Sequence, residues 1–184
     1  MTQGNIVDTI DQAMTPPVFI FVGHSNSGKT TLVERLIPEL VGRGLRIATI
    51  KHAHHRTPLD TEGKDSWRYK QAGAAASMLV TSDALQLVAD ITEARDGQDE
   101  PVRLAERFLG GADIVLGEGF SLASGPKIEV LRRERGLPPR CAIADGLIAI
   151  VTDCPEVYPE LPHFALDDIR ALADFLLRFS AARR

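Results

Sequence analysis

A segment near the start of the chain combines the side chains and the backbone freedom that phosphate chemistry requires. It runs from Gly23 to Thr30, reads GHSNSGKT, and fits the pattern G-x-x-x-x-G-K-[ST]. Its two glycines allow a tight turn, so backbone amides can surround a phosphate at the start of a helix. Lys29 is placed to reach β- and γ-phosphates, and the Thr30 hydroxyl is a ligand for Mg²⁺. The predicted phosphate-binding residues are Gly23, His24, Ser25, Asn26, Ser27, Gly28, Lys29, Thr30 and Thr31.

The elements on either side of this segment are those that a P-loop needs. Residues 18–22 form an unbroken apolar run, typical of a buried parallel strand. Leu32, Leu36 and Leu40 follow at helical spacing, although Pro38 is expected to kink or break that helix. A chance glycine-rich turn is the alternative, and it does not explain strand, Lys-Thr and helix together. We therefore expect a nucleoside triphosphate and Mg²⁺ as ligands.

Acidic residues that could hold the metal follow two further strands. Glu118 comes after the apolar stretch 112–116 and lies between two glycines. Ligands bind at the carboxyl ends of parallel strands, so Glu118 is predicted to act beside Lys29 in catalysis and beside Thr30 at Mg²⁺. An ordinary strand-end carboxylate is the alternative. Asp60, in a polar loop, is a further predicted metal residue, with Asp65 as a rival that helix capping also explains.

The second predicted strand, residues 45–50, ends in the sequence KHAHH. Lys51 and His52 are therefore predicted to lie near the phosphates. On an extended chain His52 and His54 point to one side and His55 to the other, which suits a single metal ion poorly. Contact with phosphate or with a partner is the favoured interpretation, and a transition-metal site is the alternative.

Two features near the end of the chain bear on the base and on partners. Asp153 follows the last buried strand, where a carboxylate can accept hydrogen bonds from guanine, but IVTD lacks the lysine of N/T-K-x-D. A plain strand-end turn is the alternative. Lys127 and residues 132–140 form a basic region, for which a solvated face is the default and an anionic ligand or partner the sharper hypothesis.

The whole pattern predicts an α/β fold. Buried strands alternate with helices, which indicates a three-layer P-loop NTPase fold: a mostly parallel sheet, helices on both faces and an antiparallel hairpin at one edge, from residues 75–80 and 85–91. We expect an N-terminal extension over residues 1–15 and one nucleotide-binding domain over residues 16–184.

The amino-acid composition bears on the partners and the cellular location of the protein. The chain has 184 residues, 44% of them hydrophobic, and a net charge of -4, which gives no reason to expect nucleic-acid binding. Its two cysteines make no disulfide framework, and neither a signal peptide nor a membrane-spanning run is visible. A cytoplasmic location is expected.

Five segments, in this order, carry a resemblance to a known family: GHSNSGKTTL, KHAHH, GKDSWRYKQAGA, DIVLGEGF with PKIEVLR, and IAIVTDCP. They resemble MobB, the molybdopterin-guanine dinucleotide biosynthesis adapter protein, from about residue 17 to residue 179. One departure is Gly117, where the family usually has an apolar residue before the strand-end Glu118.

The resemblance implies a homodimeric GTP-binding protein with a P-loop fold of the SIMIBI type. It implies a partner, a MobA-like molybdopterin guanylyltransferase that joins GMP from GTP to molybdopterin, with molybdopterin as a further candidate ligand. Hydrolysis of GTP is expected to be slow at best. It also implies phosphate binding by residues 23–31, Mg²⁺ near Thr30 and Glu118, and nucleotide or partner contact by Asp60 and residues 51–55. A small-molecule kinase and a metal-delivery GTPase are the alternative functions.

Overall fold

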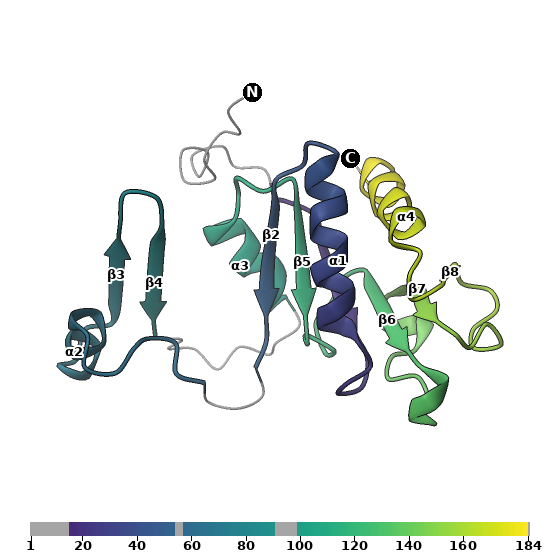
Figure 1. Cartoon of the computed structure of the whole chain (residues 1–184), viewed down its shortest axis with the longest axis horizontal. Helices are drawn as coiled ribbons and strands as arrows, with labels where there is room; N and C mark the ends of the chain where they lie inside the picture. The colour runs from purple at the N-terminus through teal and green to yellow at the C-terminus, as the bar shows by residue number, and fades with distance from the viewer. Residues whose placement is uncertain (1–14, 54–56, 91–98, 184) are drawn as a thin grey trace. The chain divides into compact units, whose positions relative to one another are not determined.

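The computed structural model describes residues 15–53, 57–90 and 99–183, which fall into two compact units. The first unit contains the chain up to His52 and from Asp96 onward, and the second contains Ala53–Arg95. Figure 1 shows the elements of both units, and each unit is described by itself. The predicted extension lies outside the described residues except for Thr15.

The first unit is built on a six-stranded sheet with the order β2-β5-β1-β6-β7-β8. Its neighbouring strands are all paired in parallel. The strands are β1 (Val18–Val22), β2 (Ile47–Lys51), β5 (Ile114–Glu118), β6 (Lys127–Leu131), β7 (Leu147–Thr152) and β8 (His163–Phe164). Because β1 is central, the loop that follows it has strand ends on both sides.

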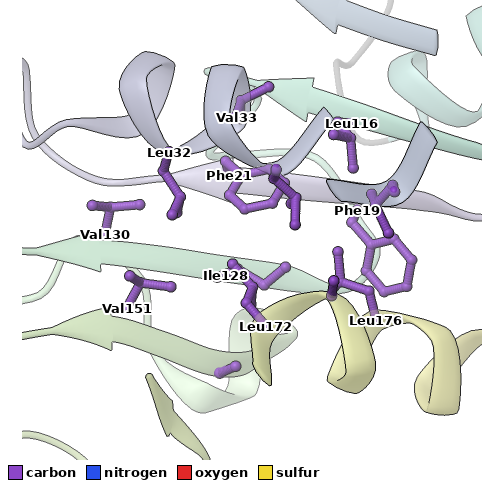
Figure 2. Close-up of a cluster of buried hydrophobic side chains, with 14 of the residues drawn as sticks. Phe19, Phe21, Leu32, Val33, Leu116, Ile128, Val130, Val151, Leu172 and Leu176 are labelled. Carbon is purple, nitrogen blue, oxygen red and sulfur yellow. The ribbon is translucent and has the colours of Figure 1, made fainter. Parts of the chain in front are cut away.

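Helices cover both faces of this sheet, as predicted. Phe19 and Phe21 of β1 belong to a buried cluster with residues of α1 (Lys29–Gly42) and α4 (Ile169–Ala181), which Figure 2 shows in close-up. Val18, Ile20 and Val22 point the other way, into a cluster that includes Ala105 of α3 (Glu100–Phe108). The alternation follows from the two-residue period of a strand.

Single residues shape two of these helices. At the start of α4, the Asp168 carboxylate caps the helix by accepting a hydrogen bond from the Ala171 amide at 3.1 Å. The sequence predicts a kink or a break at Pro38, and of these the break is wrong, because α1 continues through Pro38 to Gly42. Pro38 lies on the exposed side of the helix, where the carbonyl that loses its partner can turn towards water.

The second unit contains α2 (Asp65–Gln71) and the hairpin of β3 (Ala76–Val80) and β4 (Leu85–Ala89). The antiparallel pairing is confirmed, with Ala76 opposite Ala89 and Val80 opposite Leu85. The hairpin is a two-stranded sheet of its own and does not add strands to the main sheet. Asp65 lies in the first turn of α2, whose N-cap is Lys64 without a side-chain cap. Within the described residues, no helix has the length and apolar character needed to cross a bilayer.

Candidate functional site: a phosphate-binding loop at the centre of the sheet

The loop from β1 to α1 has the backbone that its glycines predict. Gly23 and Gly28 have φ values of 138° and 95°, and Asn26, at φ 61°, is also in the left-handed region. A Cβ on Gly23 would lie 2.5 Å from the carbonyl oxygen of Val130, so no side chain fits there. The loop therefore needs glycine at this position both for its conformation and for its contact with β6.

Lys29 folds back over the loop. Its Nζ donates to the carbonyl oxygens of Gly23, at 3.1 Å, and of His24, at 2.8 Å. Partial burial lowers the pKa of Lys29, and the nearby charge of Glu118 opposes that shift. The ammonium group is thus held at the first two residues of the loop by neutral acceptors, for which phosphate oxygens are stronger substitutes.

Thr30 and Glu118 meet as predicted. The Thr30 hydroxyl lies 3.0 Å from both carboxylate oxygens of Glu118. Glu118 ends β5 directly beside β1, and the Nζ of Lys51 lies 3.4 Å from its Oε1. A hydroxyl next to a carboxylate is a set of oxygen donors that fits Mg²⁺.

His52 contacts this group through its backbone amide and contacts Phe120 through its ring. Its amide donates to the Glu118 carbonyl oxygen at 2.9 Å, and its ring lies against Phe120 with centroids 5.3 Å apart. These contacts extend the pairing of Lys51 with Glu118 by one residue. The tip of β2 is therefore positioned beside the strand-end Glu118.

Arg132, a member of the basic region of the sequence, joins this site although it was not among the predicted phosphate-binding residues. Its Nε donates to the carbonyl oxygen of Ser27 at 3.0 Å, and its Nη2 lies 3.0 Å from the position that a Cβ on Gly28 would occupy. A cavity of about 520 Å³ is lined by Ser25, Asn26, Gly28, Lys29, Thr30, Thr31, Glu118, Arg132 and Glu134. The basic sequence around Arg132 was the only signal for this contact.

The charged residues of β6 correct the expectation of a solvated face. Lys127 and Glu129 are 2% and 0% exposed. Lys127 donates to the carbonyl oxygen of Asp145 at 2.7 Å. Glu129 accepts hydrogen bonds from the amides of Arg140, at 2.6 Å, and Cys141, at 3.1 Å. These carboxylate bonds hold residues 140–141 against the sheet.

The basic segment 132–140 also contacts the phosphate-binding loop. Nε2 of His24 lies 2.9 Å from the carbonyl oxygen of Pro138. The segment 132–140 is mostly exposed, as predicted, but both of its ends are attached to the site.

Burial raises the pKa of Glu129, and the hydrogen bonds from the amides of Arg140 and Cys141 oppose that shift.

Asp153 follows β7 and so lies two strands away from β1. Its Oδ1 accepts from the Arg133 amide at 2.7 Å, a bond that lowers the pKa of Asp153. The Asp153 side chain is exposed. The Asp153 carboxylate therefore contacts the turn after β6 and Cys154, and these contacts lie outside the phosphate-binding loop.

The prediction for Asp60 stays untested. Asp60 belongs to the second unit, where its Oδ1 accepts from the Thr61 amide at 2.7 Å. His54 and His55 lie outside the described residues. Within residues 15–53, 57–90 and 99–183, no group of three or more His, Cys, Asp and Glu side chains could hold a metal ion.

Comparisons with known proteins agree on one family. The family model for MobB, molybdopterin guanine dinucleotide synthesis protein B, matches residues 18–153. A molybdopterin-guanine dinucleotide biosynthesis adapter protein of Haemophilus influenzae is 38% identical over 162 residues, covering 87% of each chain. Its namesake in Escherichia coli is 34% identical over 166 residues, covering 89% of this chain and 93% of the relative.

A solved structure extends this likeness to three dimensions. The crystal structure of a molybdopterin-guanine biosynthesis protein B matches with a TM-score of 0.67 and 29% identity, covering 88% of this chain and 99% of the other. The predicted P-loop NTPase fold is confirmed by this similarity together with the observed sheet.

Proposed function

Because this chain belongs to the family of molybdopterin guanine dinucleotide synthesis protein B, we propose that it is a GTP-binding adapter for molybdopterin guanine dinucleotide formation. In this proposal it assists a MobA-like nucleotidyltransferase that attaches GMP to molybdopterin. The names of its relatives support the pathway, and the phosphate-binding loop supports the ligand.

The observation that carries the proposal is the contact of Thr30 with Glu118. The hydroxyl and the carboxylate lie 3.0 Å apart, beside a loop whose lysine already bridges two backbone carbonyls. Thr30 and Glu118 would hold Mg²⁺, directly or through water, and Lys29 would contact the phosphates. Bound Mg²⁺ would neutralise charge on the phosphate oxygens.

We further propose that hydrolysis is slow. A fast hydrolase needs a residue that orients or deprotonates the attacking water. The Glu118 carboxylate instead accepts a hydrogen bond from Thr30 and lies 3.4 Å from the Nζ of Lys51. In this proposal it binds Mg²⁺ and does not activate the attacking water. This arrangement is consistent with an adapter that binds GTP without hydrolysing it rapidly and assists a partner enzyme.

Calorimetric titration with GTP and with ATP, each with Mg²⁺, tests the ligand. We expect GTP to bind more tightly, and binding to be lost in Lys29→Ala. Lys64→Ala, at an exposed position of the second unit, is the matched control and should bind like the wild type. A preference for ATP, with nucleoside diphosphate production that requires a metabolite, would instead favour a small-molecule kinase.

The role as an adapter needs its own assay. The rate of GMP attachment to molybdopterin by the MobA-like enzyme should rise when the wild-type chain is added with GTP. Lys29→Ala should give a smaller increase. An unchanged rate with the wild-type chain would contradict the adapter role while leaving GTP binding intact.

Self-association is the last part of the proposal. The hairpin exposes apolar side chains on one face, where Met78 is opposite Leu87 and Val80 is opposite Leu85. Met78 is 57% exposed, Val80 66%, Leu85 42% and Leu87 37%. Such a patch is larger than isolated surface residues and is typical of an interface. Sedimentation equilibrium should give the mass of a dimer, and the double variant Met78→Ser/Val80→Ser should shift it towards the monomer. A monomeric wild type would contradict this part.

A further inference from the structure

The order of the strands gives the two sides of the phosphate-binding loop different chemistry. Glu118 ends β5 on one side of β1, and its carboxylate accepts a hydrogen bond from the Thr30 hydroxyl, the proposed Mg²⁺ pair. On the other side of β1, β6 ends just before Arg132 and β7 ends just before Asp153. For a nucleotide whose metal-bound phosphates lie towards β5, the ends of β6 and β7 are the side left for its base.

Arg132 is positioned to contact a ligand on that side. Its Nε is anchored on the Ser27 carbonyl oxygen at 3.0 Å, which fixes the plane of the guanidinium group. The ion pair of its Nη1 with Glu134 spans 3.6 Å, too long for a hydrogen bond. The side chain lines the same cavity as Lys29 and Thr30. The terminal amino groups thus keep donors for a ligand.

Asp153 follows β7, the strand paired with β6, which Arg132 follows. Leu131 of β6 is paired with Thr152 of β7, so the two residues that follow these strands are neighbours at one edge of the sheet. The Arg133 amide binds Oδ1 of Asp153 at 2.7 Å and fixes the carboxylate. A carboxylate has further lone pairs for other donors. A residue with free donors and a residue with a free acceptor site therefore follow two neighbouring strands.

Guanine is the base whose edge matches this pair. It presents two adjacent acceptors, N7 and O6, for which arginine is the common bidentate partner, whereas adenine presents a donor next to N7. Guanine also carries the N2 amino group, a donor that adenine lacks. We propose that Arg132 donates to O6 and N7 of guanine while Asp153 accepts from N1–H and the N2 amino group. This inference rests on the proposed binding of GTP.

Calorimetry with four triphosphates tests the inference: GTP, ATP, 7-deaza-GTP, which lacks the N7 acceptor, and ITP, which lacks the N2 amino group. The wild type should bind both 7-deaza-GTP and ITP more weakly than GTP. In Arg132→Met the ratio of GTP to ATP affinity should fall by roughly 10- to 100-fold. The penalty for 7-deaza-GTP should disappear in that variant, while the penalty for ITP should persist. Arg135→Met removes the same charge from the same exposed turn and should change none of these ratios.

The alternatives give other results. If Arg132 contacts phosphate, Arg132→Met weakens GTP and ATP equally, and the wild type does not distinguish 7-deaza-GTP from GTP. That result would overturn the reading of guanine by Arg132 while leaving GTP binding in place. Failure of the wild type to bind any triphosphate would overturn the proposed function together with this inference. The wild-type comparison with 7-deaza-GTP holds even if Arg132→Met folds poorly.

Discussion

The hydroxyl of Thr30, at the start of α1, lies 3.0 Å from each carboxylate oxygen of Glu118, at the end of β5. The two residues are 88 positions apart, and the parallel pairing of β1 with β5 brings them together. As the proposed Mg²⁺ ligands, the two residues would act on one ion and would depend on each other.

Removing either member should therefore weaken the binding of GTP with Mg²⁺ by a similar amount. We expect Thr30→Ala and Glu118→Gln each to lower that affinity roughly 10-fold or more. The double variant should be little worse than the single ones, because the residues act on one ion. Titrations in Mg²⁺ and in EDTA measure this, with Glu34→Gln on the exposed side of α1 as the control. Full additivity would contradict a shared ion.

Gly23→Ala should destabilise the fold. The new Cβ would meet the Val130 carbonyl oxygen at 2.5 Å, and φ is 138°. Strain and overpacking together are expected to cost about 2–4 kcal/mol of unfolding free energy. Gly44→Ala is the matched control: its φ is 85° with no atom within 4 Å, so it should cost only about 1–2 kcal/mol. Urea denaturation compares the two, and equal losses would show that contact with β6 does not matter.

Glu129 should impose a characteristic dependence of stability on pH. Burial raises its pKa in the folded state, so the folded protein holds this proton more tightly than the unfolded chain. The stabilisation is complete below the unfolded pKa and is lost as the pH rises through the folded pKa. Unfolding free energies measured upward from pH 4 should fall more steeply for the wild type than for Glu129→Gln. Glu160→Gln, at an exposed position, should keep the wild-type slope.

Leu36→Ala should lower the unfolding free energy, because Leu36 packs between α1 and the sheet. Leu36 is 0% exposed and belongs to the cluster with Phe19 and Phe21. Loss of its buried methyl groups is expected to cost about 2–5 kcal/mol. Leu122→Ala, at a residue that is 84% exposed, should cost less than about 0.5 kcal/mol. Thermal and urea unfolding of both variants measure the difference.

Much of the site could be predicted from local sequence. The apolar run of β1, the glycines of the loop and the helical spacing of Leu32, Leu36 and Leu40 lie within one short stretch. Local sterics and hydrophobic periodicity govern such a stretch, so strand, loop and helix follow from it. The prediction that Glu118 lies beside the loop also succeeded, because parallel strands place their carboxyl ends at one edge.

Other predictions failed or stay open because they depend on longer-range packing. Pro38 lies within a helix that packing against the sheet maintains, so its local preference is overridden. The metal role of Asp60 stays a prediction, because Asp60 belongs to the second unit.

The sequence by itself determined the phosphate-binding loop, its lysine and threonine, and the alternation of buried strands with helices, because these depend on neighbouring residues. Only the tertiary structure decided which charges are buried and which arginine touches the loop. Glu129 is buried because β6 lies between β1 and β7, and Arg132 reaches Ser27 across 105 positions for the same reason. Strand order is a property of the whole chain: it follows from how all the apolar faces are buried together, and no short segment encodes it.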